Sequence, residues 1–261
     1  MGAAAGLLRV ALASAAAAQS DEELAKQLSN PVSSLISVPF QNNTDFGIGP
    51  SDDGVQNWLN IQPVVPFSLS SDWNLISRTI LPVIYQNEDV IPGAGSQLGL
   101  GDTVQSLFLS PVEPSRGWIW GVGPVFLLDT ATDDRLGSDQ WGAGPTFVVL
   151  RQDGGFTWGM LANHIWGFAK DESGSDVDAT FLQPFLSHTW KNGVTVGVQT
   201  ESTYDWEGEQ WTVPINAYVS KVMRLGPQRV QFTLGARHYA EAPSGGPDWG
   251  VRFATTLLFP K

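Results

Sequence analysis

The sequence predicts an all-β fold: a single antiparallel, up-and-down transmembrane β-barrel of about 12 strands. Three observations predict it. Segments that alternate apolar and polar residues recur along the chain, tryptophan and glycine are abundant while charged residues are few, and short turns alternate with longer acidic loops. Such alternation gives each strand one apolar face, as a wall between lipid and a polar lumen requires.

The composition also narrows the class of protein. Eleven tryptophans and 28 glycines favour strands over helices. Beyond the N-terminus, no uninterrupted apolar run is long enough for a membrane-spanning helix. Cysteine is absent, so no disulfide or thiolate metal site can form. The formal net charge of −12 argues against a nucleic-acid partner.

The chain divides into three parts. Residues 1–18 predict a signal peptide, because an apolar stretch from Leu7 ends in small residues at Ala16–Ala18, although Arg9 interrupts it. A disordered alanine-rich leader is the alternative. Residues 19–31 form an N-terminal segment in which 21–31 predict a short helix that ends at Asn30-Pro31, either as a plug in the lumen or as a periplasmic tail. Residues 32–261 form the barrel.

The barrel strands follow from the period-2 alternation. In the last segment Val251, Phe253, Thr255 and Leu257 share one face, predicted to meet lipid, and Arg252 lies on the other, predicted to meet the lumen. The predicted strands begin near Val32, Val55, Asp72, Leu98, Arg116, Gln140, Phe156, Val177, Val194, Gln210, Val230 and Trp249.

The connections are of two kinds. Short turns such as Asp153-Gly154-Gly155 and Lys191-Asn192-Gly193 alternate with longer loops that carry most of the carboxylates. This sorting predicts short periplasmic turns, long external loops and both termini on the periplasmic side. A proline has no backbone N–H to donate to a neighbouring strand, so prolines inside the strand patterns predict bulges or kinks. These prolines are Pro63, Pro66, Pro82, Pro124, Pro145, Pro184 and Pro214.

Tryptophans near predicted strand ends indicate aromatic girdles at the two water–lipid boundaries. A soluble β-sandwich with core tryptophans is the alternative, but core residues would favour strand middles. The predicted interface aromatics are Trp58, Trp73, Trp118, Trp141, Trp190, Trp206, Trp211 and Trp249.

Several motifs resemble one family of bacterial proteins. They are LAKQLSNPVSSLISVPFQ at 24–41, GLGD at 99–102, GVGPVFLL at 121–128, GAGPTFVVL at 142–150 and the closing FATTLLFP. The chain resembles the outer-membrane transporters associated with the phenol meta-cleavage pathway, often labelled neuromedin U in bacterial genomes. The resemblance covers nearly the whole mature chain and implies a barrel in a Gram-negative outer membrane. Its motifs are architectural and name no substrate.

Charged residues on polar strand faces are the candidate lumen residues: Arg78, Asp102, Glu201, Arg237 and Arg252. Against lipid they would be costly, so they are expected to face inward. Two roles are open, a salt-bridge network that braces the wall and a constriction that selects a solute by charge.

Other sites find little support. The acidic run at 129–139 lacks the residue order of a calcium-binding loop. The glycines at 93–99 lack the spacing of a dinucleotide-binding motif. Ser187 and His188 are neighbours on a strand and so point to opposite faces. We therefore expect no catalytic residues, no bound metal and no cofactor.

The leading function is passive passage of a small solute, with an aromatic or hydrophobic one as a candidate, through a barrel in the outer membrane of a Gram-negative bacterium. A structural or lipopolysaccharide-binding barrel with a closed lumen is the second hypothesis, and a lipid-modifying enzyme is the third. The expected partners are outer-membrane lipids, lipopolysaccharide, the barrel-assembly machinery and an unidentified solute.

Overall fold

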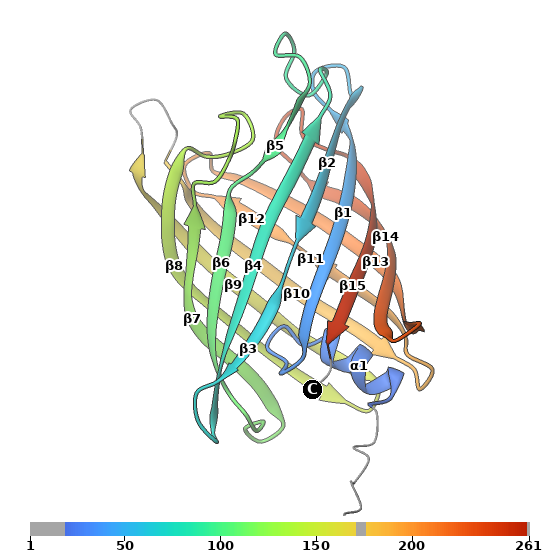
Figure 1. Cartoon of the computed structure of the whole chain (residues 1–261). Coiled ribbons are helices and arrows are strands. Elements are labelled where there is room, and N and C mark those ends of the chain that lie inside the picture. The colour runs from blue at the N-terminus through green and yellow to red at the C-terminus, as the bar shows by residue number, and fades with distance from the viewer. Residues whose placement is uncertain (1–18, 171–175, 260–261) are drawn as a thin grey trace, which may run out of the picture.

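The computed structural model describes residues 19–170 and 176–259, which form one closed β-barrel with a short helix at one end (Figure 1). The predicted signal peptide, residues 1–18, lies outside the described residues. The elements are α1 (Asp21–Leu28), β1 (Ile36–Ile48), β2 (Gly54–Ile61), β3 (Val64–Ser68), β4 (Trp73–Gln86), β5 (Gln97–Leu100), β6 (Thr103–Pro111), β7 (Trp118–Leu128), β8 (Gln140–Asp153), β9 (Phe156–Lys170), β10 (Asp178–Thr189), β11 (Val194–Thr200), β12 (Ser202–Asp205), β13 (Gln210–Leu225), β14 (Gln228–Glu241) and β15 (Trp249–Phe259).

The barrel closes where its first and last strands meet. β1 pairs with β2 on one side and with β15 on the other, from Ile36 opposite Phe259 to Phe46 opposite Trp249. β2 continues into β3, β5 into β6 and β11 into β12, so the wall has 12 strands, all antiparallel. Closure pairs backbone groups that an open sheet edge would expose to lipid. The predicted fold class is confirmed.

The two ends of the barrel differ. The short connections lie at the end that also holds α1 and the C-terminal end of β15, which we call the turn end (Figure 1). The longer connections lie at the opposite end, the loop end. No helix among the described residues is long and apolar enough to cross a membrane.

The predicted strand starts agree with the structure to within two residues, except the first. β1 begins at Ile36 and not near Val32, because residues 31–35 leave the sheet and pack inside the barrel. There Val32 and Leu35 are 5% and 3% exposed.

Most of the prolines inside the strand patterns coincide with irregularities of the wall. Pro63 separates β2 from β3, and the register shifts between Val213 and Pro214. Residues 144 and 145 fall in a gap of the β8–β9 ladder. Pro124 falls in a gap of the β6–β7 ladder, Pro82 lies where two residues of β4 face three at the junction of β5 and β6, and Pro184 faces the break between β11 and β12. Pro66 stays in register with Ile76 of β4, and no bulge marks its position there.

Alternation along the strands separates the lipid face from the lumen. On β15, Val251 and Phe253 are 42% and 52% exposed, whereas Arg252 and Ala254 are 3% and 6% exposed. A closed barrel can expose apolar side chains in this way only if the solvent outside its wall is lipid.

Helix α1 forms because its first turn is capped. The Ser20 side chain accepts a hydrogen bond from the Glu23 backbone, and the Glu23 side chain accepts one from the Ser20 backbone. The predicted helix over 21–31 is shorter in the structure, ending at Leu28 before Asn30-Pro31. Its buried residues Leu24 and Ala25 face the barrel interior.

Candidate functional site: the lumen

The N-terminal segment, residues 19–35, forms the floor of the lumen at the turn end. Leu24, Ala25 and Leu35 pack against Val222 and Leu258 of the wall. Val32 joins a second cluster with inward-facing residues of β4, β6, β8 and β9: Ile76, Phe108, Val148, Leu150 and Leu161. Of the two placements left open by the sequence, the structure shows the one inside the barrel.

Polar contacts also tie the floor to the wall. The Arg229 guanidinium pairs with the Asp21 carboxylate, and the Gln152 side-chain amide donates to the Lys26 carbonyl at 2.8 Å. The floor is thus attached to β14 and β8 as well as to the apolar clusters.

Above the floor lies a cavity of about 500 Å³. Its lining is mixed. The strands from β3 to β10 contribute apolar side chains together with polar ones such as Arg78 and Gln183; the apolar ones include Val64, Ile80, Val104, Phe181 and Phe185. The other strands contribute mainly amides, hydroxyls and charged groups, among them Gln41, Asn60, Gln62, Gln199, Glu201 and Arg252. A solute in this cavity would meet apolar and hydrogen-bonding side chains together.

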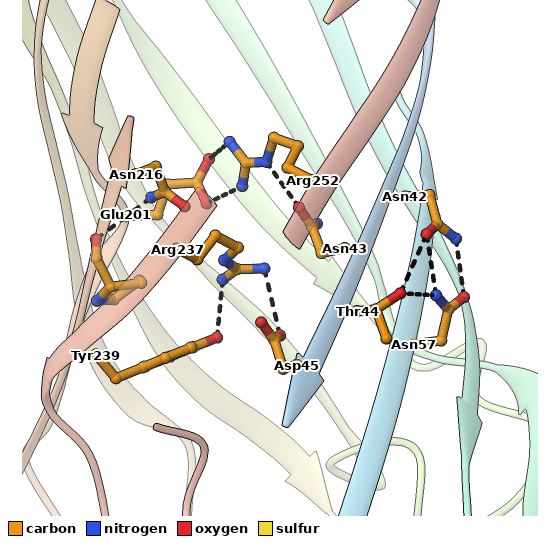
Figure 2. A network of polar contacts seen from close by, with 11 residues as sticks. Asn42, Asn43, Thr44, Asp45, Asn57, Glu201, Asn216, Arg237, Tyr239 and Arg252 are labelled. Atoms are coloured by element: carbon orange, nitrogen blue, oxygen red, sulfur yellow. Dashed lines mark hydrogen bonds and ion pairs between the residues drawn. The ribbon is translucent and has the colours of Figure 1, made fainter. Parts of the chain in front are cut away.

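An ion pair crosses the polar side of the cavity (Figure 2). Arg252 Nη1 and Nη2 donate to the two carboxylate oxygens of Glu201 at 3.1 and 2.6 Å, and Arg252 Nε donates to Asn43 Oδ1 at 2.7 Å. The bidentate geometry fixes both side chains. Gly235 lies opposite Arg252 on β14, where a Cβ would come within 3.0 Å of the Ala217 carbonyl oxygen and 3.2 Å of the Tyr218 Cβ.

A second ion pair lies closer to the loop end (Figure 2). Arg237 Nη1 donates to Asp45 at 3.3 Å, and Arg237 Nη2 donates to the Tyr239 hydroxyl at 2.9 Å. The side chains of Arg237 and Asp45 are 9% and 4% exposed. Arg237 and Arg252 therefore each have a carboxylate partner.

Arg78 has none. Among the residues that the structure describes, its guanidinium makes no hydrogen bond or ion pair, although Glu201 is near enough to attract it electrostatically. Its cross-strand neighbours are Val64 and Ser106, and Ile76 and Ile80 flank it on the same face of β4. The Arg78 side chain lines the cavity, and three of these four neighbours are apolar.

Tyr218 enters the cavity between two glycines. Its cross-strand partners are Gly197 on β11 and Gly235 on β14. A Cβ at Gly197 would lie 2.5 Å from the tyrosine hydroxyl, so only glycine lets the ring lie across that strand. Ser187 of β10 lines the same cavity.

Asp102 does not belong to the charged network. It anchors the loop of residues 129–139: its Oδ2 accepts from the Ser138 backbone at 2.6 Å and from the Ser138 hydroxyl at 2.7 Å, and its Oδ1 accepts from the Ala131 backbone at 3.3 Å. The loop folds over the lumen-facing Trp58, leaving a second cavity of about 370 Å³ beside Arg135. Asp102 lies between β5 and β6, outside both strands, and the sequence pattern did not indicate its loop partners.

Carboxylates crowd this loop. The pKa of Asp129 is raised, first by partial burial and then by the negative charges of Asp102, Asp139 and Asp134. Hydrogen bonds from the Arg135 backbone and side chain hold the pKa of Asp133 below its usual range. No group of three potential metal ligands forms among the described residues.

The tryptophans form two outward-facing belts, with one exception among those predicted. Trp73, Trp118 and Trp190 lie at the turn end, and Trp141, Trp206, Trp211 and Trp249 lie at the loop end. Trp58 is the exception, because it pairs with Asn43 on the lumen face of the wall. Sequence reasoning missed Trp158, which stacks edge-on with Trp118, and Trp166, which is 52% exposed.

One polar cluster faces outward and was not predicted. Asn42, Thr44 and Asn57 form a hydrogen-bonded group on the outer faces of β1 and β2, with distances from 2.7 to 3.0 Å to the Asn57 side chain (Figure 2). Mutual hydrogen bonding reduces the cost of these groups beside lipid.

Within the part of the chain that the structure describes, Ser187 and His188 do not form a catalytic pair. Ser187 lines the cavity, whereas His188 lies outside between the rings of Phe156 and Trp190. His164 contacts the Thr180 hydroxyl at 2.8 Å and Asp178 at 3.1 Å on the outer face. Trp206 Nε1 already donates to that hydroxyl at 2.9 Å.

Comparison with known proteins supports the fold. No family model matches the chain, and no curated protein does. The crystal structure of the COG4313 outer membrane channel from Pseudomonas putida F1 is similar, with a TM-score of 0.68 at 16% identity over 86% of this chain and 95% of that one. Outer membrane phospholipase A from Escherichia coli gives 0.47 at 10% identity over 92% and 98% of the two chains, too distant to carry an argument.

The chain is an outer-membrane β-barrel. Its lipid-facing apolar band, its two aromatic belts and the shared fold agree on this point, and the predicted location in the outer membrane of a Gram-negative bacterium is confirmed.

Proposed function

We propose that the protein is a channel for passive passage of a small solute across the outer membrane. The observation that carries the proposal is the cavity of about 500 Å³ above the N-terminal floor, which apolar, amide and charged side chains line together. A barrel that only anchored or braced the membrane would have no need of a chamber with converging polar groups. In this proposal the turn end faces the periplasm, as short turns do in such barrels.

The solute class follows from two lines of support. The apolar wall formed by residues such as Ile80, Phe181 and Phe185 suits a hydrophobic body. The resemblance to transporters of the phenol meta-cleavage pathway suggests an aromatic one. The solved relative's name says only that it is an outer membrane channel.

The experiment is single-channel recording of the purified full chain in planar bilayers. Stepwise conductance with transient closures is expected, because the floor is held by side-chain contacts and takes no part in the described strand pairing. Flat traces at all voltages, from protein shown to be folded, would contradict passage.

A closed structural barrel is the second candidate. It is favoured by the floor itself, whose two apolar clusters seal the turn end. Flat traces that persist after removal of residues 19–35 would support it.

A further inference from the structure

We infer that the lumen cavity is a binding site for a small organic monoanion, a carboxylate with an aromatic or branched apolar body, whose carboxylate is held by Arg78. The inference rests on the proposed function but concerns binding, so it can be tested without passage. The first step is the charge balance. Arg252 is matched by Glu201 and Arg237 by Asp45, whereas Arg78 is unmatched among the described residues.

The second step is position. Arg78 and Glu201 lie on opposite walls, on the third and ninth of the 12 barrel strands, and they interact across the lumen. A solute between them meets two guanidiniums and a single carboxylate already committed to one of them. One positive charge therefore remains for an anion. A dianion would carry an unmatched negative charge close to Glu201.

The third step is the surroundings of Arg78. Val64, Ile76 and Ile80 lie next to it, and Phe181 and Phe185 belong to the same apolar wall. A strongly hydrated inorganic anion would lose water there without gaining contacts. A carboxylate on an apolar body would gain two kinds of contact there. The planar guanidinium would donate two parallel hydrogen bonds to the carboxylate, and the apolar body would cover the apolar side chains of the wall.

The probe is benzoate, with benzamide as its neutral isostere. Binding to the folded chain in detergent micelles is measured by titration calorimetry. Because a charge-assisted hydrogen bond is lost with the charge, benzamide is expected to bind about 10- to 100-fold more weakly than benzoate. This comparison uses the unmodified chain, so it holds whether or not any variant folds. Equal binding of the two probes would overturn the inference.

Variants then locate the site. Arg78→Met keeps the length of the side chain but removes its charge, so it is expected to lower the benzoate affinity to the level of benzamide. Arg78→Lys keeps the charge without the planar fork, so it should retain part of the benzoate affinity. Arg224→Met makes the same change at an exposed turn-end arginine and should leave benzoate binding unchanged. Glu201→Gln removes the negative charge that competes for Arg78 and should tighten binding. Benzoate binding that survives Arg78→Met would place the anion elsewhere and refute the assignment.

Bilayer recording separates this inference from the proposed function. Benzoate binding without conductance would refute the channel and leave the site intact. Conductance without benzoate binding would refute the site and leave the channel intact.

Discussion

The two halves of the lumen are built on different principles. At the turn end the interior is dry, and buried apolar side chains such as Leu24, Val32 and Phe108 join the N-terminal segment to the wall. Toward the loop end the interior is polar, with paired ions such as Arg252–Glu201 around a cavity. The first half therefore closes the barrel, and the second half can discriminate among solutes. This division can be broken experimentally at four places.

The largest effect is expected at the lipid face, which both halves share. Leu234 is 62% exposed and lies opposite Phe253 near the middle of β15. Leu234→Arg should cost about 2–4 kcal/mol near the membrane midplane. Its neighbour Thr233 lines the cavity, so Thr233→Arg is the matched control. The folded fraction is measured by the heat-dependent band shift on a denaturing gel. Normal folding of Leu234→Arg together with loss of folding in Thr233→Arg would mean that the strand faces are inverted.

The next effect concerns the dry half. Val32→Asp places a carboxylate in the buried cluster with Phe108 and Leu150, at a cost of several kcal/mol unless the segment leaves. Since residues 31–35 are outside the strand ladder, we expect the floor to detach while the wall stays folded. Ser34→Asp, at an exposed position of the same segment, is the control. Bilayer recording should show more open time for Val32→Asp alone. Unchanged conductance with an intact barrel would show that the floor does not block passage.

The fold was more predictable from the sequence than the site. The alternation of apolar and polar residues located every wall strand, because one face of each strand meets lipid and every second residue is therefore apolar. Inside the lumen the sequence predicted inward-facing Arg237 and Arg252 but gave no pairing among the charged residues, since Glu201 and Arg252 are 51 residues apart in sequence. Trp58 shows the limit of the rule for aromatic residues: it lies in the middle of β2, opposite Asn43 on the inward face of the wall.

A smaller effect is expected in the polar half. The side chains of Arg252 and Glu201 are 4% and 19% exposed, so losing either leaves a poorly solvated charge. Arg252→Ala or Glu201→Ala should lower the free energy of unfolding by about 1–3 kcal/mol, less than in a dry core because the cavity can admit water. The double variant should lose less than the sum of the two. Urea unfolding in micelles measures this. Additive losses would mean that the pair is not coupled and that its role is not bracing.

The smallest effect is expected at the loop end, where one side chain holds the 129–139 loop. Asp102 accepts three hydrogen bonds from that loop, two of them from Ser138 at 2.6 and 2.7 Å. Asp102→Asn keeps the shape but replaces a charged acceptor, which should weaken the anchor by about 1–2 kcal/mol and leave global unfolding unchanged. Hydrogen exchange at the Ala131 and Ser138 amides should become faster. Asp52→Asn, in another loop at the same end, is the control for a general effect of charge. If exchange at these two amides is unaltered, the loop is held by the packing of Leu136, which is 7% exposed, rather than by Asp102.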